Sequence, residues 1–290
     1  MTVLAAVGFG YCARHLVATR PDAFKRVIAT ARSPAGVAAL PAEVEGFQFD
    51  GERLSVPLAT ALAEAEVLIV SAPPDAAGDP VLRHAGAALA TGRLRQVIYL
   101  TTLGVYGDHQ GGWVDEASPA RAGTERLDRR LAAEAAWFAF GRRHGVAVAA
   151  LRLAGIYGPG RNVLVQLQAG EARIIDRPGQ VFNRIHVEDI SRAIGAVVAR
   201  RFDGVLNVAD DLPTAPGEPV SYGAGLLGLA PPPAIPFAEA ARTMTPMALS
   251  FWGASKRVSN HRLKAALGVQ LAYPTYREGL DALAAAGEGR

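Results

Sequence analysis

The chain has 290 residues, of which 50% are hydrophobic, enough for one large domain or for a domain with a smaller lobe. Its 30 Lys and Arg side chains are nearly balanced by 27 Asp and Glu, which does not indicate the clustered basic face that nucleic-acid binding needs. One cysteine, Cys12, excludes an internal disulfide, the six histidines form no zinc motif, and no apolar run approaches the ~18 residues of a membrane span. We therefore expect a cytoplasmic protein with no nucleic-acid partner, no membrane contact and no metal.

Short apolar runs alternate with helical patterns along the first half of the chain. The runs that predict strands are continuous and rich in Val, Ile and Leu, as strands buried on both faces should be: Val3–Val7, Arg26–Thr30, Gly46–Phe49, Val67–Ser71, Gln96–Thr101 and Val146–Leu153. Helices are predicted between them at Ala13–Thr19, Ser55–Ala63, Pro80–Ala90 and Leu127–His144. This alternation predicts an α/β fold with a doubly wound, Rossmann-type parallel sheet.

The regular alternation of predicted strands and helices ends after Leu153. A helix is predicted over Val187–Arg200 and a strand over Val205–Val208, whereas the Pro- and Gly-rich stretch Leu212–Pro236 predicts an irregular loop. A last helix is predicted after Asn260, with Gly268 as its stop. We expect a dinucleotide-binding domain over residues 1–157, to which 181–210 return, and a smaller substrate lobe from 158–180 and 211–290.

A glycine-rich turn joins the first predicted strand to the first predicted helix. Gly8, Gly10 and Ala13 form the pattern G-x-G-x-x-A, with Tyr11 inside it. Gly8 permits a tight turn, Gly10 lets the backbone approach a pyrophosphate at the helix N-terminus, and Ala13 keeps the helix close to the sheet. The pattern at this place predicts dinucleotide binding.

The end of the second predicted strand bears on which dinucleotide binds. NAD sites usually place a carboxylate there for the ribose 2′-OH, but this chain has Ala31 and Arg32. An arginine can pair with a 2′-phosphate, so NADP(H) is favoured over NAD. Asp50, Ser71 and Ala72, at the ends of the third and fourth strands, are further candidates for cofactor contact; for Asp50 a turn-forming role is equally open.

Four further segments carry a resemblance to a known family: Tyr99–Gly107, Leu151–Arg161, Asn183–Ile190 and Leu206–Asp210. With the glycine turn, they resemble the extended short-chain dehydrogenase/reductase family, the NAD-dependent epimerase/dehydratase group, up to about residue 210. The resemblance implies an oxidoreductase or epimerase fold in which a Ser or Thr at the end of the fifth strand binds the substrate. Thr102 matches that position.

The chain departs from the family where a Tyr-x-x-x-Lys pair is expected. Alignment on Glu134 places Arg126 and Arg130 at the two positions, and no tyrosine occurs between Gly107 and Tyr157. Arginine keeps its proton at ordinary pH, so Arg126 cannot replace the family's proton-donating tyrosine, while Arg130 can still supply positive charge. This pattern resembles atypical subgroups that lack the pair; a purely solvated helix face with Glu125 and Asp128 as partners is the alternative.

Other candidates lie in loops beyond the strand ends. Tyr106 and Tyr157 could take over proton donation or substrate contact, although turn tyrosines mostly pack. Arg161 and Lys256 match places where family members hold a nucleotide-sugar diphosphate, and Arg184 lies in the third resembling segment. The resemblance implies an architectural role for that segment, with Asp189 as a buried hydrogen-bond acceptor.

These observations favour an NADP(H)-dependent oxidoreductase of the atypical extended type, acting on a small polar or anionic molecule. A non-catalytic NADP(H)-sensing protein and a nucleotide-sugar epimerase or dehydratase remain alternatives. Because family members often pair through helices beside the active site, a monomer or a homodimer is expected.

Overall fold

The computed structural model describes residues 2–289, and contacts between them divide the chain into two compact units. Unit 1 comprises the residues up to Val105, Ala122–Arg152 and Ser191–Leu206; unit 2 comprises Tyr106–Arg121, Leu153–Ile190 and the residues from Asn207 on. The domain boundary expected at residue 157 stays a prediction. Within residues 2–289, no helix is both long and apolar enough to span a lipid bilayer.

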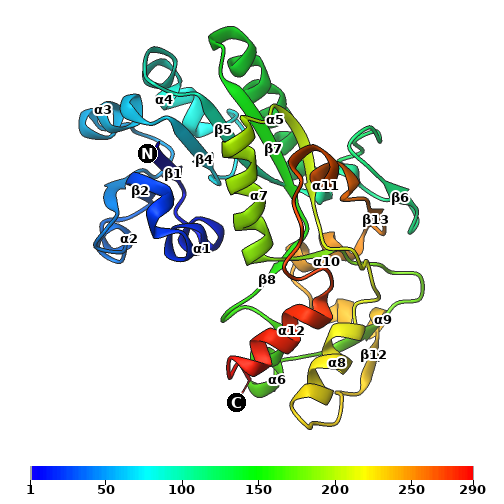
Figure 1. The fold of residues 1–290 in the computed structure, drawn as a ribbon. Helices are drawn as coiled ribbons and strands as arrows, with labels where there is room; N and C mark the ends of the chain where they lie inside the picture. Colours follow the sequence, from blue (N-terminus) through cyan, green and yellow to red (C-terminus); the bar gives the residue numbers. More distant parts are fainter. Residues whose placement is uncertain (1, 290) are drawn as a thin grey trace. The chain divides into compact units, whose positions relative to one another are not determined.

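A seven-stranded parallel sheet is the frame of unit 1 (Figure 1). Its strands lie in the order β11 (Gly204–Val208), β7 (Ala147–Leu153), β5 (Gln96–Thr102), β4 (Val67–Val70), β1 (Thr2–Val7), β2 (Phe24–Ala31) and β3 (Glu45–Gln48). The doubly wound α/β fold expected from the alternating pattern is confirmed, because every predicted strand pairs within this one sheet.

Helices connect these strands, and several of them begin at a side-chain cap. They are α1 (Tyr11–Thr19), α2 (Pro34–Ala38), α3 (Val56–Glu64), α4 (Pro80–Thr91), α5 (Glu125–His144) and α7 (Val187–Arg200), with 3-10 turns at Pro21–Ala23 and Leu103–Tyr106. Ser55, Asp79 and Thr124 cap α3, α4 and α5 by accepting backbone N–H groups of the first turn, as these residue types commonly do. Gly145 ends α5 in the left-handed conformation, with φ of 67°.

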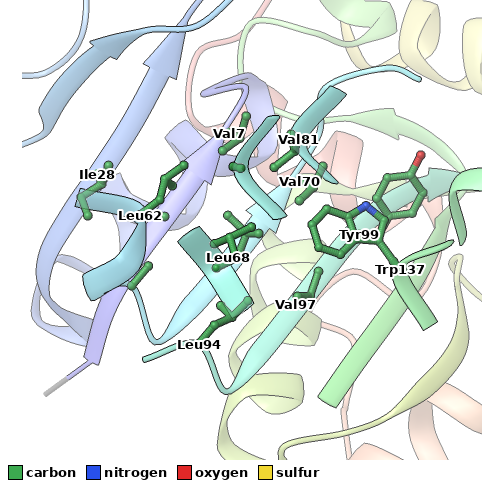
Figure 2. Close-up of a cluster of buried hydrophobic side chains, with 14 of the residues drawn as sticks. Val7, Ile28, Leu62, Leu68, Val70, Val81, Leu94, Val97, Tyr99 and Trp137 are labelled. Carbon is green, nitrogen blue, oxygen red and sulfur yellow. The ribbon is translucent and has the colours of Figure 1, made fainter. Parts of the chain in front are cut away.

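The core of unit 1 lies between the sheet and the helices on one of its faces. Figure 2 shows Val7, Leu68, Val70 and Val97 from neighbouring strands together with Leu62, Val81 and Trp137 from the covering helices. Because these strands are buried on both faces, their apolar runs are continuous rather than alternating. The packed sheet therefore fixes where each strand ends, and the site is built at those ends.

Unit 2 is made of shorter elements. They are β6 (Trp113–Val114), β8 (Gly155–Tyr157), α6 (Val163–Gln168), β9 (Ile174–Asp176), β10 (Arg184–His186), α8 (Glu218–Leu226), β12 (Ala234–Pro236), α9 (Phe237–Ala240), a 3-10 turn at Ala241–Thr243, α10 (Pro246–Trp252), β13 (Arg257–Val258), α11 (His261–Leu267) and α12 (Tyr276–Ala285). Three parallel strand pairs, β10–β8, β12–β9 and β13–β6, join segments that are far apart in the sequence.

The irregular loop predicted over Leu212–Pro236 is wrong, because this stretch contains α8 and β12. Gly223 of α8 is buried, and a Cβ there would meet Leu164 and Val163 at 3.1 Å. Gly223 thus allows α8 to pack closely against α6, and the helix continues through its glycines. The predicted stop at Gly268 is confirmed, since it caps α11 with φ of 62°.

Candidate functional site

The order of the strands predicts where a ligand binds in unit 1. The chain runs from β1 outward to β2 and β3, then returns to the other side of β1 as β4. The connections after β1 and β4 therefore diverge, and in open parallel sheets a ligand-binding crevice is expected at the carboxyl ends of two such strands. The segment Gly8–Gly10 follows β1 and Ser71–Ala72 follows β4, so both groups of candidate residues lie at this point.

The turn after β1 depends on Gly8. Its φ of +88° lies in the left-handed region, and a Cβ there would lie 2.5 Å from the Ser71 hydroxyl oxygen. The Gly8 amide donates to Thr30 Oγ1 at 3.0 Å, and the Ser71 hydroxyl donates to the Gly8 carbonyl. The amides of Phe9 and Gly10 donate to the carbonyls of Thr30 and Gly8, at 3.1 and 2.8 Å. All three turn amides are therefore satisfied within the protein.

The start of α1 offers what a phosphate needs. Among residues 2–289, no side chain caps the first turn of α1, and that turn contains no acidic residue. A Cβ built on Gly10 would have no described atom within 4 Å, whereas Ala13 is 2% exposed and packs inward. Open space at Gly10 beside the positive end of a nine-residue helix fits a pyrophosphate group. Tyr11, the first residue of α1, is half-buried.

The end of β2 presents a positive side chain. Arg32 is exposed, and within the described residues it forms no ion pair. Asp50 is also exposed; its Oδ1 accepts the Glu52 amide at 2.9 Å, and this backbone contact lowers the pKa of the carboxyl. The contact with the Glu52 amide fits the turn-forming role considered for Asp50. The exposed Arg32 guanidinium follows β2, next to β1 in the sheet.

The residues expected around the reaction centre in unit 1 differ in orientation. Thr102 is half-buried, and its hydroxyl oxygen accepts the Gly104 amide at 3.1 Å, which leaves the hydroxyl proton for donation. Arg126 is exposed. Arg130 is turned toward β5, where its Nη1 donates to the Leu100 carbonyl at 3.2 Å and lies 3.4 Å from the Tyr99 hydroxyl. Burial raises the pKa of Tyr99 to about 12, so this tyrosine keeps its proton.

Glu134, the residue used for the alignment, is part of a buried ion pair. Its carboxylate pairs with Arg152 of β7 at 2.8 Å and accepts the Thr101 hydroxyl at 2.9 Å. Neither charged residue is more than 9% exposed. The pair joins α5 to β5 and β7, and so fixes the helix that carries Arg126 and Arg130.

The two loop tyrosines are packed within unit 2. Tyr106 is fully buried and donates its hydroxyl to Asn207 Oδ1 at 2.7 Å. Tyr157 is 8% exposed, donates to the Thr275 carbonyl at 3.3 Å and has its pKa raised by burial. The structure thus gives both hydroxyls internal partners, which argues against either as the proton donor.

The basic candidate residues of unit 2 differ in exposure. Arg161 is exposed. Lys256 is buried and donates to the Gly107 carbonyl at 2.8 Å, and burial lowers its pKa. Arg184 donates to the Phe182 carbonyl at 3.3 Å, and burial lowers its pKa as well. Arg161 is therefore the member of this set best exposed to a ligand.

Asp189 is a buried acceptor, as the resemblance implied. It is fully buried and accepts the backbone amides of Ala272 and Tyr273, at 2.6 and 3.0 Å. One residue that supports the turn after β1 was not predicted from the sequence. Thr30, whose hydroxyl accepts the Gly8 amide, could have been found as a polar residue near the end of an apolar strand.

Asp210 should make the stability of the protein depend on pH. It is 1% exposed, its Oδ2 accepts no hydrogen bond from the described residues, and burial raises its pKa to about 8. An unfolded aspartate has a pKa of about 3.9, so between about pH 4 and 8 the unfolded chain releases a proton that the folded chain retains. The contribution of Asp210 to the free energy of unfolding is therefore largest below pH 4 and is lost as the pH rises to 8.

Urea unfolding of the wild type and of Asp210→Asn at pH 5 and pH 8 measures this contribution. Asparagine cannot ionise, so the variant should gain stability relative to the wild type as the pH rises, by at most about 4 kcal/mol at about 1.4 kcal/mol per pH unit. Equal pH dependence of the two proteins would show that Asp210 titrates normally.

Comparisons with known proteins support the fold. A Silicibacter pomeroyi DSS protein of unknown function has a structure that is 43% identical in sequence, with a TM-score of 0.86 over 99% of this chain and 100% of that chain. A Methylobacillus flagellatus protein assigned as an NAD-dependent epimerase/dehydratase is 26% identical, with a TM-score of 0.73 over 99% and 98% of the two chains. MoeE5, solved with UDP-glucuronic acid and NAD, is 23% identical, with a TM-score of 0.75 over 96% of each chain, and shares the fold.

One curated protein is also similar. The 3-diazoavenalumate denitrifying reductase of a Streptomyces species is 28% identical over 178 residues, which are 58% of this chain and 55% of that protein. The match therefore spans about half the length of that relative. No protein-family model matches the chain.

Proposed function

Because the chain belongs to the extended short-chain dehydrogenase/reductase family, we propose that it is an NADP(H)-dependent oxidoreductase acting on a small polar substrate. The observation that supports the cofactor most strongly is the open space at Gly10 beside the uncapped first turn of α1, at the crevice between β1 and β4. MoeE5, which shares this fold, was solved with NAD. This supports a nicotinamide dinucleotide as the cofactor and does not decide between NAD and NADP.

The preference for the phosphorylated cofactor rests on Arg32. In an NAD site the corresponding place usually holds a carboxylate, which would repel a 2′-phosphate. The exposed Arg32 guanidinium would instead pair with that phosphate. The side chain of Arg14 lies over the Phe9 ring of the turn, with its guanidinium carbon 5.3 Å from the ring centre, and adds positive charge near the same turn.

We propose that the chain belongs to the atypical subgroup that lacks the Tyr-x-x-x-Lys pair. Bound NADPH would supply a hydride for a carbonyl carbon. Thr102 would orient the carbonyl oxygen through its hydroxyl proton, and Arg130, held against β5, would contribute positive charge from the adjacent wall. Arg126 would bind substrate charge, since an arginine cannot donate its proton near neutral pH. The proton would then come from water.

A protein that senses NADP(H) without turnover is the second candidate. Two observations favour the sensor: the Tyr-x-x-x-Lys pair is absent, and the hydroxyls of Tyr106 and Tyr157 are bonded inside the protein. Consumption of NADPH with a panel of carbonyl compounds separates the two functions. Turnover with any of them excludes the sensor, and tight binding without turnover excludes the oxidoreductase. The alternative of a nucleotide-sugar epimerase or dehydratase predicts stabilisation by UDP- or dTDP-sugars.

Arg32→Ala should remove the preference for the phosphorylated cofactor. Ligand binding stabilises the folded protein by RT ln(1 + [L]/Kd), so thermal shifts with NADP, NADPH, NAD and NADH rank the four affinities. The loss of one charge-assisted ion pair should weaken NADPH binding by at least about tenfold, or about 1.5 kcal/mol, and leave NADH nearly unchanged. Arg93→Ala is the matched control, because Arg93 is exposed and precedes β5, at the amino-terminal end of the parallel strands and not at the carboxyl end where Arg32 lies. If wild-type protein binds NADH as tightly as NADPH, the proposed preference is wrong.

A further inference from the structure

Three loops of unit 1 meet at the amino-terminal edge of its sheet. They precede β5, β7 and β11, which are neighbours in the sheet. The side-chain amide of Gln96, a residue that is 1% exposed, joins the loops by donating to the carbonyls of Ala147 and Phe202 at 3.3 and 3.0 Å. The Ala147 amide in turn donates to the Arg95 carbonyl at 3.1 Å. These contacts hold the residues that flank the three strand starts in one surface.

Three pairs of arginines flank these strand starts, and we call the surface that they form the basic edge. All six are exposed: Arg93, Arg95, Arg142, Arg143, Arg200 and Arg201. Nη1 of Arg95 lies 4.0 Å from a carboxylate oxygen of Glu66, whereas the other five arginines form no ion pair with the described residues. Asp203 is the acidic residue within the loops, and its Oδ1 already accepts the Val148 amide at 2.9 Å. The basic edge therefore presents guanidinium groups whose charge is not balanced from within.

The ends of helices account for part of this charge. Helices α4, α5 and α7 all end at the basic edge, and the C-terminus of a helix carries roughly half a negative charge that basic residues stabilise. Three helix ends therefore offset about 1.5 positive charges. Six arginines less the two carboxylates of Glu66 and Asp203 leave a charge of +4. About 2.5 positive charges thus remain without a counter-charge inside the protein.

The rest of the chain is close to neutral. The sequence has 30 Lys and Arg and 27 Asp and Glu, of which six and two lie at the basic edge, so 24 and 25 remain. The near balance of the whole composition therefore conceals a local cluster. Its three arginine pairs are about 50 residues apart in the sequence, and the pairing of β5, β7 and β11 brings them together.

The surroundings of the basic edge favour a protein as its partner over a lipid surface or a nucleic acid. The large hydrophobic residues that are exposed in the described chain lie elsewhere: Val56, Trp113, Leu229, Met247 and Phe251. Among the described residues, the basic edge therefore has no exposed apolar side chain to insert into a lipid surface and no exposed Phe, Tyr or Trp to stack on bases. A nucleic acid is typically held through about six to ten phosphate contacts, for which an excess of about 2.5 charges is small. A few charge pairs are enough to orient two proteins.

We propose that the basic edge docks an acidic surface of a partner protein. Arginine binds carboxylates through two parallel N–H groups, so exposed Asp and Glu of the partner pair with guanidinium groups that lack an internal counter-charge. The site proposed for NADP(H) lies at the carboxyl ends of the strands, and the seven residues of β5 separate the two ends by about 20 Å. A docked partner therefore leaves the cofactor site open. The docking surface is independent of the proposed function, because none of its arginines belongs to that site.

The binding of an acidic probe to the full chain tests this surface. Fluorescence anisotropy follows a dye-labelled poly-glutamate peptide at about 10 and about 150 mM salt, between which the Debye length falls from about 30 to about 8 Å. The wild type should bind the peptide, and more weakly at the higher salt. Arg142→Glu/Arg200→Glu lowers the local charge from +4 to zero and should weaken binding by at least about tenfold. Arg173→Glu/Arg242→Glu makes the same change in net charge at two exposed residues of unit 2 and should stay within about threefold of the wild type.

A DNA duplex and phosphatidylserine vesicles are the two other probes, and the peptide should bind more tightly than either at about 150 mM salt. Three results would overturn the proposal: no binding of the peptide, equal binding by the two double variants, or tighter binding of DNA or vesicles than of the peptide. Arg93→Glu/Arg95→Glu, which leaves the last turns of the helices unchanged, serves if the first variant does not fold. Thermal shifts with NADPH measure the cofactor site separately. A protein that binds the peptide but not NADPH therefore contradicts the proposed function alone.

Discussion

Gly10→Ala is expected to weaken NADPH binding by about 100-fold while changing the free energy of unfolding by less than about 1 kcal/mol. The backbone at Gly10 has φ of −86°, which alanine adopts without strain. No described atom lies within 4 Å of the added Cβ, so the substitution disturbs nothing in the protein. The methyl group would instead enter the space that a pyrophosphate at the start of α1 needs, and forced overlap of this kind costs about 3 kcal/mol.

Gly8→Ala is the matched comparison, because it should act on the protein itself. Its φ of +88° is unfavourable for alanine, and its Cβ would lie 2.5 Å from the Ser71 hydroxyl oxygen. We expect this variant to lose about 2 to 4 kcal/mol of stability. Thermal unfolding without ligand, followed by NADPH titration, separates the two effects. If Gly10→Ala binds NADPH like the wild type, the dinucleotide does not bind at α1, and the proposed function loses its main support.

The parts of the fold that the sequence predicts well are those with strands buried on both faces. A strand covered on both faces must be apolar throughout, so runs such as Val67–Val70 are visible in the sequence. The glycine turn is equally visible, because a left-handed φ at Gly8 demands a particular residue type. Unit 2 lacks both signals: its strands are two or three residues long, too short for any period, and α8 contains glycines that sequence patterns associate with loops.

The directions of the side chains within the site could not be predicted from the sequence, for a different reason. The four-residue spacing of Arg126 and Arg130 places them on one side of α5, but it does not say how a long side chain bends. In the structure Arg126 stays exposed, while Arg130 reaches the Leu100 carbonyl on β5. The contacts of Lys256 and Glu288 could not be predicted either, because their partners, Gly107 and Gly160, lie more than 100 residues away in the chain.

Arg152→Met should cause the largest loss of stability among the single substitutions considered. The Glu134 carboxylate, 4% exposed, would keep the Thr101 hydroxyl as a donor but lose its positive partner. Removing one member of a buried ion pair leaves an uncompensated charge and typically costs about 3 to 5 kcal/mol. Because α5 is joined to β5 and β7 through this pair, the loss should also loosen the helix that holds Arg130 against β5.

The double variant Glu134→Gln/Arg152→Met distinguishes the lost charge balance from lost packing. Methionine fills part of the arginine volume, and glutamine still accepts the Thr101 hydroxyl, so no buried charge remains. Replacing both members of a buried ion pair with uncharged groups is often nearly neutral, and we expect the double variant to recover most of the stability lost by the single one. Urea unfolding of the wild type, both single variants and the double variant gives the coupling free energy. Two results would contradict the idea that Arg152 balances a buried charge. One is a loss of less than about 1 kcal/mol in the Arg152→Met variant. The other is a double variant that is as unstable as Arg152→Met alone.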